Sequence, residues 1–153
     1  MPTGSNAVRF LQRYIDTHIP LTGDMGIRVE TWDDGGLTLT APFGPNRNDK
    51  NTAFGGSLSV MVTLGGWGLT FLYLRDAGMQ ADVMVRRTRI DYDRPVHGEI
   101  VTRCRMPTEQ ERQRFLDALR TTGKARWDLT LEVEGRDAPA VVCEGVFVAV
   151  STL

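Results

Sequence analysis

Histidine and cysteine are scarce in this sequence, which contains two residues of each type. Cys104 and Cys143 lie in separate apolar stretches, without a CxxC motif or any other spacing typical of metal ligands. We therefore expect two buried, reduced thiols, no metal site and no cofactor. His18 and His97 stand alone, and a lone histidine in a turn is more often a surface residue than a catalyst.

The sequence also lacks an excess of charge of one sign. It has 18 basic and 19 acidic residues, which leaves a net charge of -1. Proteins that bind nucleic acid usually carry a basic excess, so this balance argues against such a partner. Residues 1–12 lack the apolar core of a signal peptide, which favours a cytoplasmic location. The length of 153 residues fits one domain spanning residues 1–153.

Charge is absent from one long stretch, 51-NTAFGGSLSVMVTLGGWGLTFLYL-74. A membrane-spanning helix needs about 20 mostly apolar residues, so the length alone would allow one. The stretch contains five glycines, which weaken a free helix but suit a place where a sheet or a ligand approaches the backbone. Its serines and threonines would make a poor surface toward lipid. The pattern therefore predicts a buried central helix over about residues 54–74 and no membrane span.

The segments around this stretch are typical of strands and short helices. Six strands are predicted, at 26–32, 37–43, 82–94, 99–106, 125–133 and 140–150. The first two flank the turn 33-DDGG-36, and turns at 94–98 and 135–139 are expected to join strands that are neighbours in the sheet. Helical spacing predicts a helix over 5–19 that ends at Pro20, and a charged surface helix inserted at about 108–121. The pattern as a whole is α+β.

Two local patterns resemble those of hotdog thioesterases. The first is 46-NRNDKNTAFGGSLSVMVTLGGWG-68, in which an Asn-rich loop and an aromatic residue precede a Gly-Gly pair that opens the helix. The second is 90-IDYDRPVHGEIVTRC-104, with Arg-Pro-Val and Gly between two strands. Together with 5–19 and 20-PLTGDMGIRV-29, these patterns give the chain a resemblance to the YiiD C-terminal type of thioesterase over most of residues 5–150.

The resemblance implies a hotdog fold, in which an antiparallel sheet wraps around one long central helix. It also implies a homodimer or a dimer of dimers, that is a homotetramer, with acyl-thioester sites at the subunit interface. The usual reaction of such proteins is hydrolysis of an acyl-CoA or of an acyl group on a carrier protein. The acyl chain and the choice between CoA and a carrier protein stay open.

Thioester hydrolysis builds negative charge on the carbonyl oxygen, and the N-terminus of a helix offers free N–H groups that can bind that charge. Gly55 and Gly56 stand where the central helix is predicted to begin, so both are candidate catalytic residues. The alternative is that these glycines only permit tight packing.

The loop before the helix supplies the polar candidates. Asn48 best matches the position that orients water or the thioester in hotdog thioesterases, and it is a candidate catalytic residue. Asn46 is a candidate substrate-binding residue, and Asp49 could serve as a base. The alternative is that all three are turn or solvated surface residues.

The sequence departs from the pattern of related thioesterases at two positions. Phe54 stands where many relatives have a histidine, which disfavours a hotdog dehydratase. Thr63 stands where many have a carboxylate on the central helix, so the general base is not identified. Thr63 is a candidate catalytic residue that could position water from the partner subunit's helix, or it could bond to a helix carbonyl.

Three residues are candidates for contact with the substrate, namely Phe54, Ser57 and Trp67, with core packing as the alternative. Arginines 86, 87 and 89 on one strand, with 103 and 105 on the next, are expected to form a basic patch. This patch could bind CoA phosphates or an acidic carrier protein, or its arginines could pair with Asp91, Asp93 and Glu99 across strands. Besides an acyl thioesterase, the sequence allows a non-catalytic acyl- or lipid-binding hotdog protein, supported by the missing carboxylate. A structural interaction domain is the third possibility.

Overall fold

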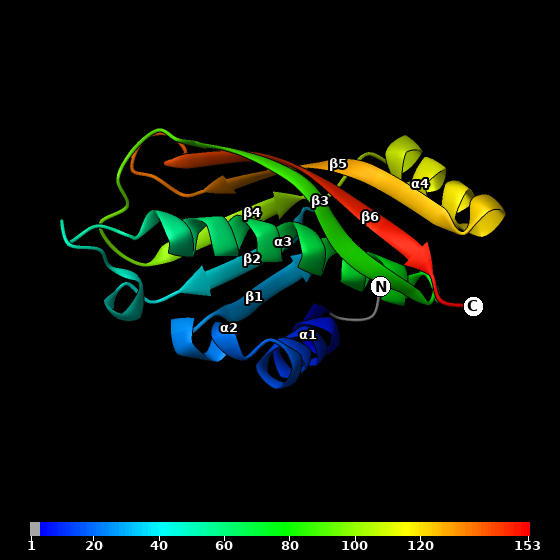
Figure 1. Cartoon of the computed structure of the whole chain (residues 1–153), viewed down its shortest axis with the longest axis horizontal. Helices are drawn as coiled ribbons and strands as arrows, with labels where there is room; N and C mark the ends of the chain where they lie inside the picture. The colour runs from blue at the N-terminus through cyan, green and yellow to red at the C-terminus, as the bar shows by residue number, and fades with distance from the viewer. Residues whose placement is uncertain (1–3) are drawn as a thin grey trace.

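The computed structural model describes residues 4–153, in which six strands form one antiparallel sheet curled around a long helix (Figure 1). The strands are β1 Arg28–Asp33, β2 Gly36–Ala41, β3 Ala81–Tyr92, β4 Ile100–Arg105, β5 Lys124–Val133 and β6 Val141–Ser151. Their order in the sheet is β1-β2-β4-β5-β6-β3. The helices are α1 Gly4–His18, α2 Pro20–Met25, α3 Gly55–Asp76 and α4 Glu109–Thr122, with a 3-10 turn η1 at Gly44–Asn46.

The central helix α3 lies across the concave face of the sheet, which confirms the α+β hotdog arrangement predicted from the sequence (Figure 1). It begins one residue later and ends two residues later than the predicted range 54–74. Its length and composition would suffice for a membrane span, yet two thirds of its most apolar window is buried inside the fold. The helix is therefore the core that the strands enclose.

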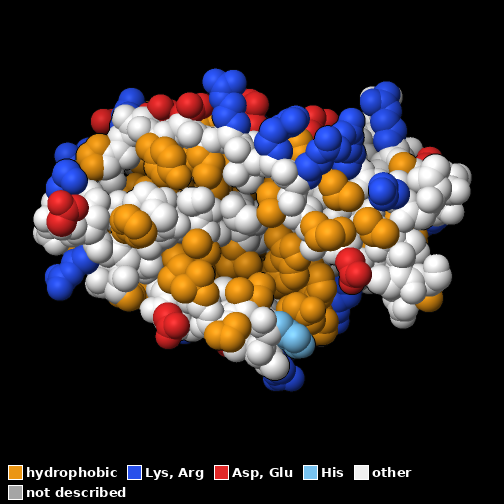
Figure 2. Space-filling model, viewed as in Figure 1, with side chains coloured by type: hydrophobic (Ala, Val, Ile, Leu, Met, Phe, Trp, Pro, Cys, Tyr) orange, Lys and Arg blue, Asp and Glu red, His pale blue; other side chains and the backbone are white. Residues whose placement is uncertain are grey.

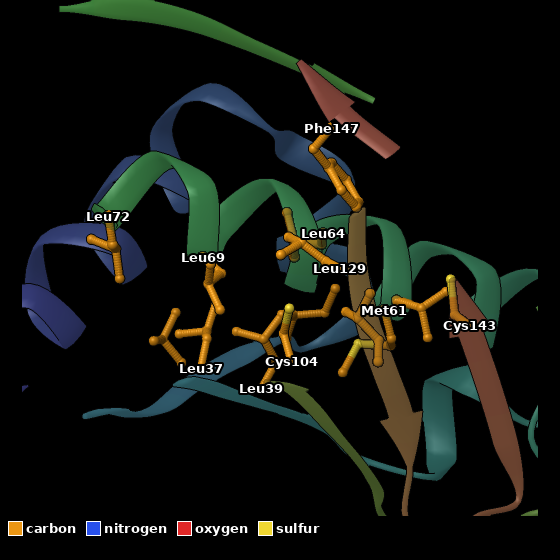
Figure 3. Packing of buried hydrophobic residues seen from close by; sticks show 14 of the residues in the cluster. Leu37, Leu39, Met61, Leu64, Leu69, Leu72, Cys104, Leu129, Cys143 and Phe147 are labelled. Carbon is orange, nitrogen blue, oxygen red and sulfur yellow. The ribbon is translucent and has the colours of Figure 1, made fainter. Parts of the chain in front are cut away.

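Glycines allow the sheet to approach α3 closely. A Cβ atom at Gly66 would lie 2.1 Å from the ring of Phe147, and one at Gly68 would lie 2.9 Å from the Leu37 side chain. Figure 3 shows Phe147, Leu129 and Leu37 reaching toward α3 from different strands. Phe147 is fully buried, so this contact leaves it no space to move. This confirms the prediction that these glycines let the sheet approach the helix closely.

The hairpin of β1 and β2 forms around residues 33–36, as the sequence predicted. Gly36 adopts φ +125, and a Cβ atom there would collide with the backbone oxygen of Cys104 on the neighbouring strand. Only glycine is compatible with both the backbone conformation and this contact.

The expectation that residues 94–98 join neighbouring strands is wrong. β3 pairs only with β6, whereas β4 pairs with β2 and β5, so the segment between them crosses from one side of the sheet to the other. Alternation of apolar and polar residues along the sequence identifies strands, but it does not indicate which strands pair with each other. The turn at 135–139 does join neighbours, namely β5 and β6.

Helices α1, α2 and α4 complete the core. α1 ends at His18, one residue before the predicted end at residue 19, and Pro20 then opens the short helix α2, which the sequence did not predict. The predicted insert at 108–121 is α4, begun by a capping box between Thr108 and Glu111. It is more than a surface helix, because Phe115 stacks on Trp127 at a ring distance of 4.0 Å.

Both cysteines are buried and unpaired, as expected from the sequence. Burial raises the pKa of the Cys104 thiol, and it raises the pKa of Cys143 to about 11 with a further contribution from the nearby Glu144. The two thiols are therefore neutral core residues at physiological pH, and neither is a nucleophile.

We predict that Gly66→Ala destabilises the protein, because the added methyl group must displace the buried ring of Phe147. The expected loss is roughly 1–3 kcal/mol, despite a helix-propensity gain of about 1 kcal/mol. Gly23→Ala is the matched control, since no atom lies within 4 Å of a Cβ at that helical position. Urea unfolding measures both variants. Equal stability of Gly66→Ala and the parent protein would contradict the close-approach argument.

Candidate functional site

The N-terminus of α3 presents free backbone donors. Phe54 is the N-cap residue, and no side chain caps the helix or places an acid in its first turn. The first helical hydrogen bond runs from the Leu58 amide to the Phe54 carbonyl. Within residues 4–153, the amides of Gly55, Gly56 and Ser57 have no acceptor, so they are available to a ligand oxygen.

The two glycines at this helix start differ in their surroundings. A Cβ atom at Gly55 would lie 3.8 Å from the ring of Tyr92, which is ordinary contact, so packing does not require glycine there. A Cβ atom at Gly56 would lie 2.3 Å from the ring of Phe54. Phe54 is 56% exposed and its ring lies across Gly56, so it covers the helix start on the solvent side. Both glycines have helical φ values, so backbone conformation does not demand them either.

The loop before α3 is held by two asparagines. Asn46 is buried, and its side-chain amide donates to the carbonyls of Met25 and Pro42, both at 2.8 Å. Its backbone carbonyl accepts from the Phe54 amide at 2.7 Å. Asn46 thus links α2, the loop and the start of α3, and it does not line the groove described below. Its predicted contact with substrate stays a prediction.

Asn48 uses its whole side chain within the same loop. The Oδ1 atom accepts from the amides of Lys50 and Thr52 at 2.9 and 3.1 Å. The Nδ2 atom donates to Thr52 Oγ1 at 2.9 Å and to the Ala53 carbonyl at 3.4 Å. These bonds shape the turn in which Asn51 adopts φ 61. The turn-residue alternative therefore has direct support, and the catalytic role stays a prediction.

The end of β3 and the crossing segment close the other side of the helix start. The Ala53 amide donates to the Val96 carbonyl at 2.8 Å, which fixes the loop against the crossing segment. The Tyr92 hydroxyl lies 3.5 Å from the Gly55 carbonyl, and the side chain is 51% exposed. Tyr92 was not among the candidates from sequence. The missed signal is that a strand returning antiparallel to the helix must end beside the helix start.

An open groove of about 560 Å³ runs between α3 and β3. Figure 2 shows hydrophobic side chains gathered on the face that carries these two elements. The groove is lined by Ser59, Val60, Thr63, Leu64 and Trp67 of α3, by residues 83–85 of β3, and by Ile19. Three and four residues separate its positions on α3, so they share one helix face with Gly56. The lining of the groove on α3 therefore begins at Ser59, one turn after Gly56.

The structure brings only some of the predicted residues into the groove. Thr63 and Trp67 line it, whereas Ser57 is 8% exposed and is not part of the lining. The hydroxyls of Ser59 and Thr63 have no hydrogen-bond partner within residues 4–153. The helix-carbonyl alternative considered for Thr63 instead describes Thr70, which donates to the Gly66 carbonyl at 2.8 Å. Ser59 was missed, although its spacing from Gly56 and Thr63 indicates the same face.

No carboxylate or histidine lines the groove. Among the residues that the structure describes, no cluster of histidine, cysteine and acidic side chains could hold a metal ion. His18 stacks on Tyr14 at a ring distance of 4.0 Å with its Nδ1 atom at the Tyr14 carbonyl, and His97 is exposed. The site therefore offers amide donors, two hydroxyls and an apolar channel, but no strong base.

The predicted basic patch is divided by the sheet order. Arginines 86, 87 and 89 lie on the edge strand β3, and two strands separate them from Arg103 and Arg105 on β4. Arg89 pairs with Asp91 at 3.9 Å along its own strand, and Arg103 pairs with Glu134 at 2.7 Å. The expectation of one patch over neighbouring strands is wrong, for the same reason as the error at residues 94–98.

Comparison with known proteins agrees with this geometry. The family model described as "Putative thioesterase (yiiD_Cterm)" matches residues 8–151. A protein of unknown function from Chlorobaculum tepidum TLS matches with a TM-score of 0.93 and 31% identity, over 98% of this chain and 98% of that one. The "putative thioesterase" from Shewanella oneidensis matches with a TM-score of 0.83 and 26% identity, over 95% of this chain and 99% of that one.

A thioesterase from Haemophilus influenzae has the same fold, with a TM-score of 0.70 over 95% of this chain and 92% of that one. Its sequence identity is 11%, so this likeness concerns the fold alone. The family model spans nearly all of the sequence, from the first helix to the last strand. The chain therefore belongs to the YiiD C-terminal thioesterase family.

Proposed function

We propose that this protein hydrolyses acyl thioesters, with the acyl chain in the groove between α3 and β3 and the thioester carbonyl at the start of α3. The observation that supports this most is that an apolar groove begins on α3 one turn after three free amides at the start of the same helix. The amides suit an oxygen that gains negative charge, and the groove suits a hydrocarbon chain.

In the proposed reaction, water attacks the carbonyl carbon and the oxygen becomes an oxyanion at the amides of Gly55 and Gly56. The carbon–sulfur bond then breaks, and the proton released from water passes to solvent or to the departing thiol. A thiol has a pKa of about 8.5, so the leaving group needs little help from an acid. The positive end of the α3 dipole stabilises the oxyanion without any change of shape in the protein.

The positions of Ser59 and Thr63 along α3 indicate different roles for their hydroxyls. Ser59 follows Gly56 by three residues, or roughly 4.5 Å along the helix axis, so it can reach a thioester bound at its own helix start. Thr63 follows by seven residues, or roughly 10 Å, and is too far from that point in the same chain. Thr63 therefore fits the role that the sequence suggested, positioning water at the partner subunit's site.

An assembly through β3 provides that partner. The outer edge of β3 pairs with no strand among residues 4–153, and Met84 and Val85 on it are 46% and 44% exposed. A long edge strand exposes unpaired N–H and C=O groups, which can pair with a strand of another chain. Pairing of two β3 strands would cover these side chains and close the open side of the groove. We therefore propose a homodimer, or a dimer of dimers, in the cytoplasm.

The second candidate function is acyl binding without hydrolysis. It is favoured by the absence of a carboxylate or histidine from the groove lining. Turnover of acyl-CoA and acyl-carrier-protein substrates separates the two functions. Saturable binding of an acyl-CoA without hydrolysis would select the second, and the relative rates on the two carriers identify the natural thiol.

We predict that Gly55→Ala lowers kcat/KM for acyl-CoA hydrolysis by roughly 10- to 100-fold while leaving the fold intact. A Cβ atom on a helix leans toward the N-terminus, so the methyl group would stand in front of the free amides. The structure has room for this methyl group, so the melting temperature should not fall. Gly98→Ala is the control, because a Cβ there meets no atom within 4 Å. Full activity of Gly55→Ala would remove the oxyanion role.

We predict that Asn48→Ala lowers both activity and stability, because four hydrogen bonds hold the loop through this side chain. The stability loss should be about 1–2 kcal/mol, measured by urea unfolding. Asn48→Asp keeps the two bonds from the amides of Lys50 and Thr52, but it loses the donations to Thr52 and Ala53 and cannot donate to the substrate, so it should recover part of the stability. Recovery of stability without activity would support a catalytic amide. Recovery of both would assign Asn48 to the loop alone.

We predict a dimer of about 34 kDa, twice the chain mass of 17.0 kDa, or a multiple of that dimer, by light scattering at micromolar concentration. Val85→Lys should shift the equilibrium toward monomer, because it places a charge on the β3 edge. Leu21→Lys is the matched control, since Leu21 is 51% exposed but lies on α2, away from that edge. A monomeric parent protein, or a Val85→Lys variant that stays fully dimeric, would contradict assembly through β3.

A further inference from the structure

A second hollow of about 480 Å³ continues the line of the groove along α3. It is lined by Phe71, Leu74 and Arg75 of the helix and by residues 79–81 before and at the start of β3. Val83 lines both the groove and this hollow. Because Phe71 and Leu74 follow Trp67 by four and seven residues, the two spaces lie in succession over the same helix face.

A stack of aromatic rings separates the two spaces. The rings of Trp67 and Phe71 are 4.9 Å apart and nearly parallel, with an interplanar angle of 18°. Tyr14 on α1 lies beside both, at 4.7 Å from the Phe71 ring and 6.0 Å from the Trp67 ring. Phe10, one turn earlier on α1, stacks on Phe71 at 6.0 Å. Contacts from two helices thus hold Trp67, which is the last residue of α3 in the groove lining.

We propose that Trp67, held by Phe71 and Tyr14, ends the acyl-binding groove and so determines the maximum length of the acyl chain. This inference rests on the proposed thioesterase function, and it deepens it by assigning the substrate class as short- and medium-chain acyl thioesters. A longer chain would have to displace the aromatic stack before it could reach the second hollow.

The length of the groove supports this substrate class. Gly56 and Trp67 are eleven residues apart, or roughly 16 Å along the helix axis, and the Trp67 side chain leans back toward the start by up to a turn. The usable length is therefore roughly 10–16 Å. An extended chain advances about 1.3 Å per bond, as the backbone does over its three bonds per residue, so roughly eight to twelve carbons fit.

The second hollow is an unfavourable place for the end of a hydrocarbon chain while the aromatic rings remain stacked. The Arg75 guanidinium lies 4.1 Å from the centre of the Phe10 ring and 3.7 Å from the carboxylate of Asp76. A terminal methyl group in that hollow would meet charged groups as well as Leu74. The selectivity of the groove therefore arises at Trp67, before the chain reaches this charged end.

The test compares chain-length profiles of the parent protein, Trp67→Ala and Trp67→Leu, using straight-chain acyl-CoAs from butyryl to palmitoyl. Each methylene that gains a buried position should strengthen binding by about fourfold. Truncation of Trp67 should therefore raise the ratio of kcat/KM for palmitoyl-CoA over octanoyl-CoA by roughly tenfold or more. Trp67→Leu keeps an apolar side chain, so it should show a smaller shift in a stable protein.

Phe10→Leu is the matched control. Phe10 belongs to the same aromatic cluster and contacts Phe71, but it lines only the space beyond Trp67. Its truncation should lower stability without changing the chain-length profile. Melting temperatures of all variants distinguish a change in the groove from a general loss of structure.

Displacement of a fluorescent fatty acid by the same acyl-CoAs gives a readout that does not need hydrolysis. Hydrolysis with an unchanged profile in both Trp67 variants would overturn the chain-length role and leave the thioesterase proposal intact. A parent protein that binds but does not hydrolyse, with a binding profile that lengthens in Trp67→Ala, would support the chain-length role and overturn the thioesterase proposal. Neither binding nor hydrolysis would overturn both.

Discussion

Close contact between the sheet and one face of α3 is the constraint on which the other elements depend. Glycines at 65, 66 and 68 let Leu131, Phe147 and Leu37 come within 3 Å of where a Cβ atom would be. Interiors are packed as densely as organic crystals, so these positions accept no larger residue without movement of the sheet. One side of the helix is therefore in close contact with the strands, and the opposite side lines the groove.

The free side of α3 is where the site forms. Because a helix repeats every 3.6 residues, the face opposite the glycines presents Gly56, Ser59, Thr63 and Trp67 in a row. β3 returns along this row and ends beside the helix start at Tyr92, so one strand supplies the second wall of the groove. The edge that makes this wall is also the edge left unpaired within one chain. The proposed substrate binding and the proposed assembly would therefore both depend on β3.

The loop before α3 leaves the first amides of the helix without an acceptor, while the Phe54 ring covers the helix start on the solvent side. The side chains of Asn46 and Asn48 hold the loop through hydrogen bonds. Asn46 donates to the carbonyls of Met25 and Pro42, and Asn48 bonds to Thr52 and to neighbouring amides. As a result, no loop side chain turns back to cap α3, and its amides stay available. Asn48, a catalytic candidate from the sequence, and Asn46, a substrate-binding candidate, thus hold the shape of the loop, whatever further role Asn48 has.

The sequence alone determined the six strands, the helices α1, α3 and α4 and the buried position of α3, because alternation, helical spacing and an uncharged stretch rich in glycine are local properties of the chain. The resemblance of two motifs was enough for the family, and it located the helix start at Gly55 and Gly56. Ser59 and Tyr92 stand within the two motifs, but their places beside the groove and the helix start depend on how α3 and β3 pack together.

Only the tertiary structure decided which strands pair, and hence that residues 94–98 cross the sheet and that the arginines of β3 and β4 lie apart. Strand order depends on contacts between distant segments, which no local pattern contains. The same reason applies to the groove, whose walls come from α3, β3 and Ile19, and to the stack that places Tyr14 of α1 beside Trp67. These side chains meet because the sheet curls around the helix, and the curl is a property of the whole chain.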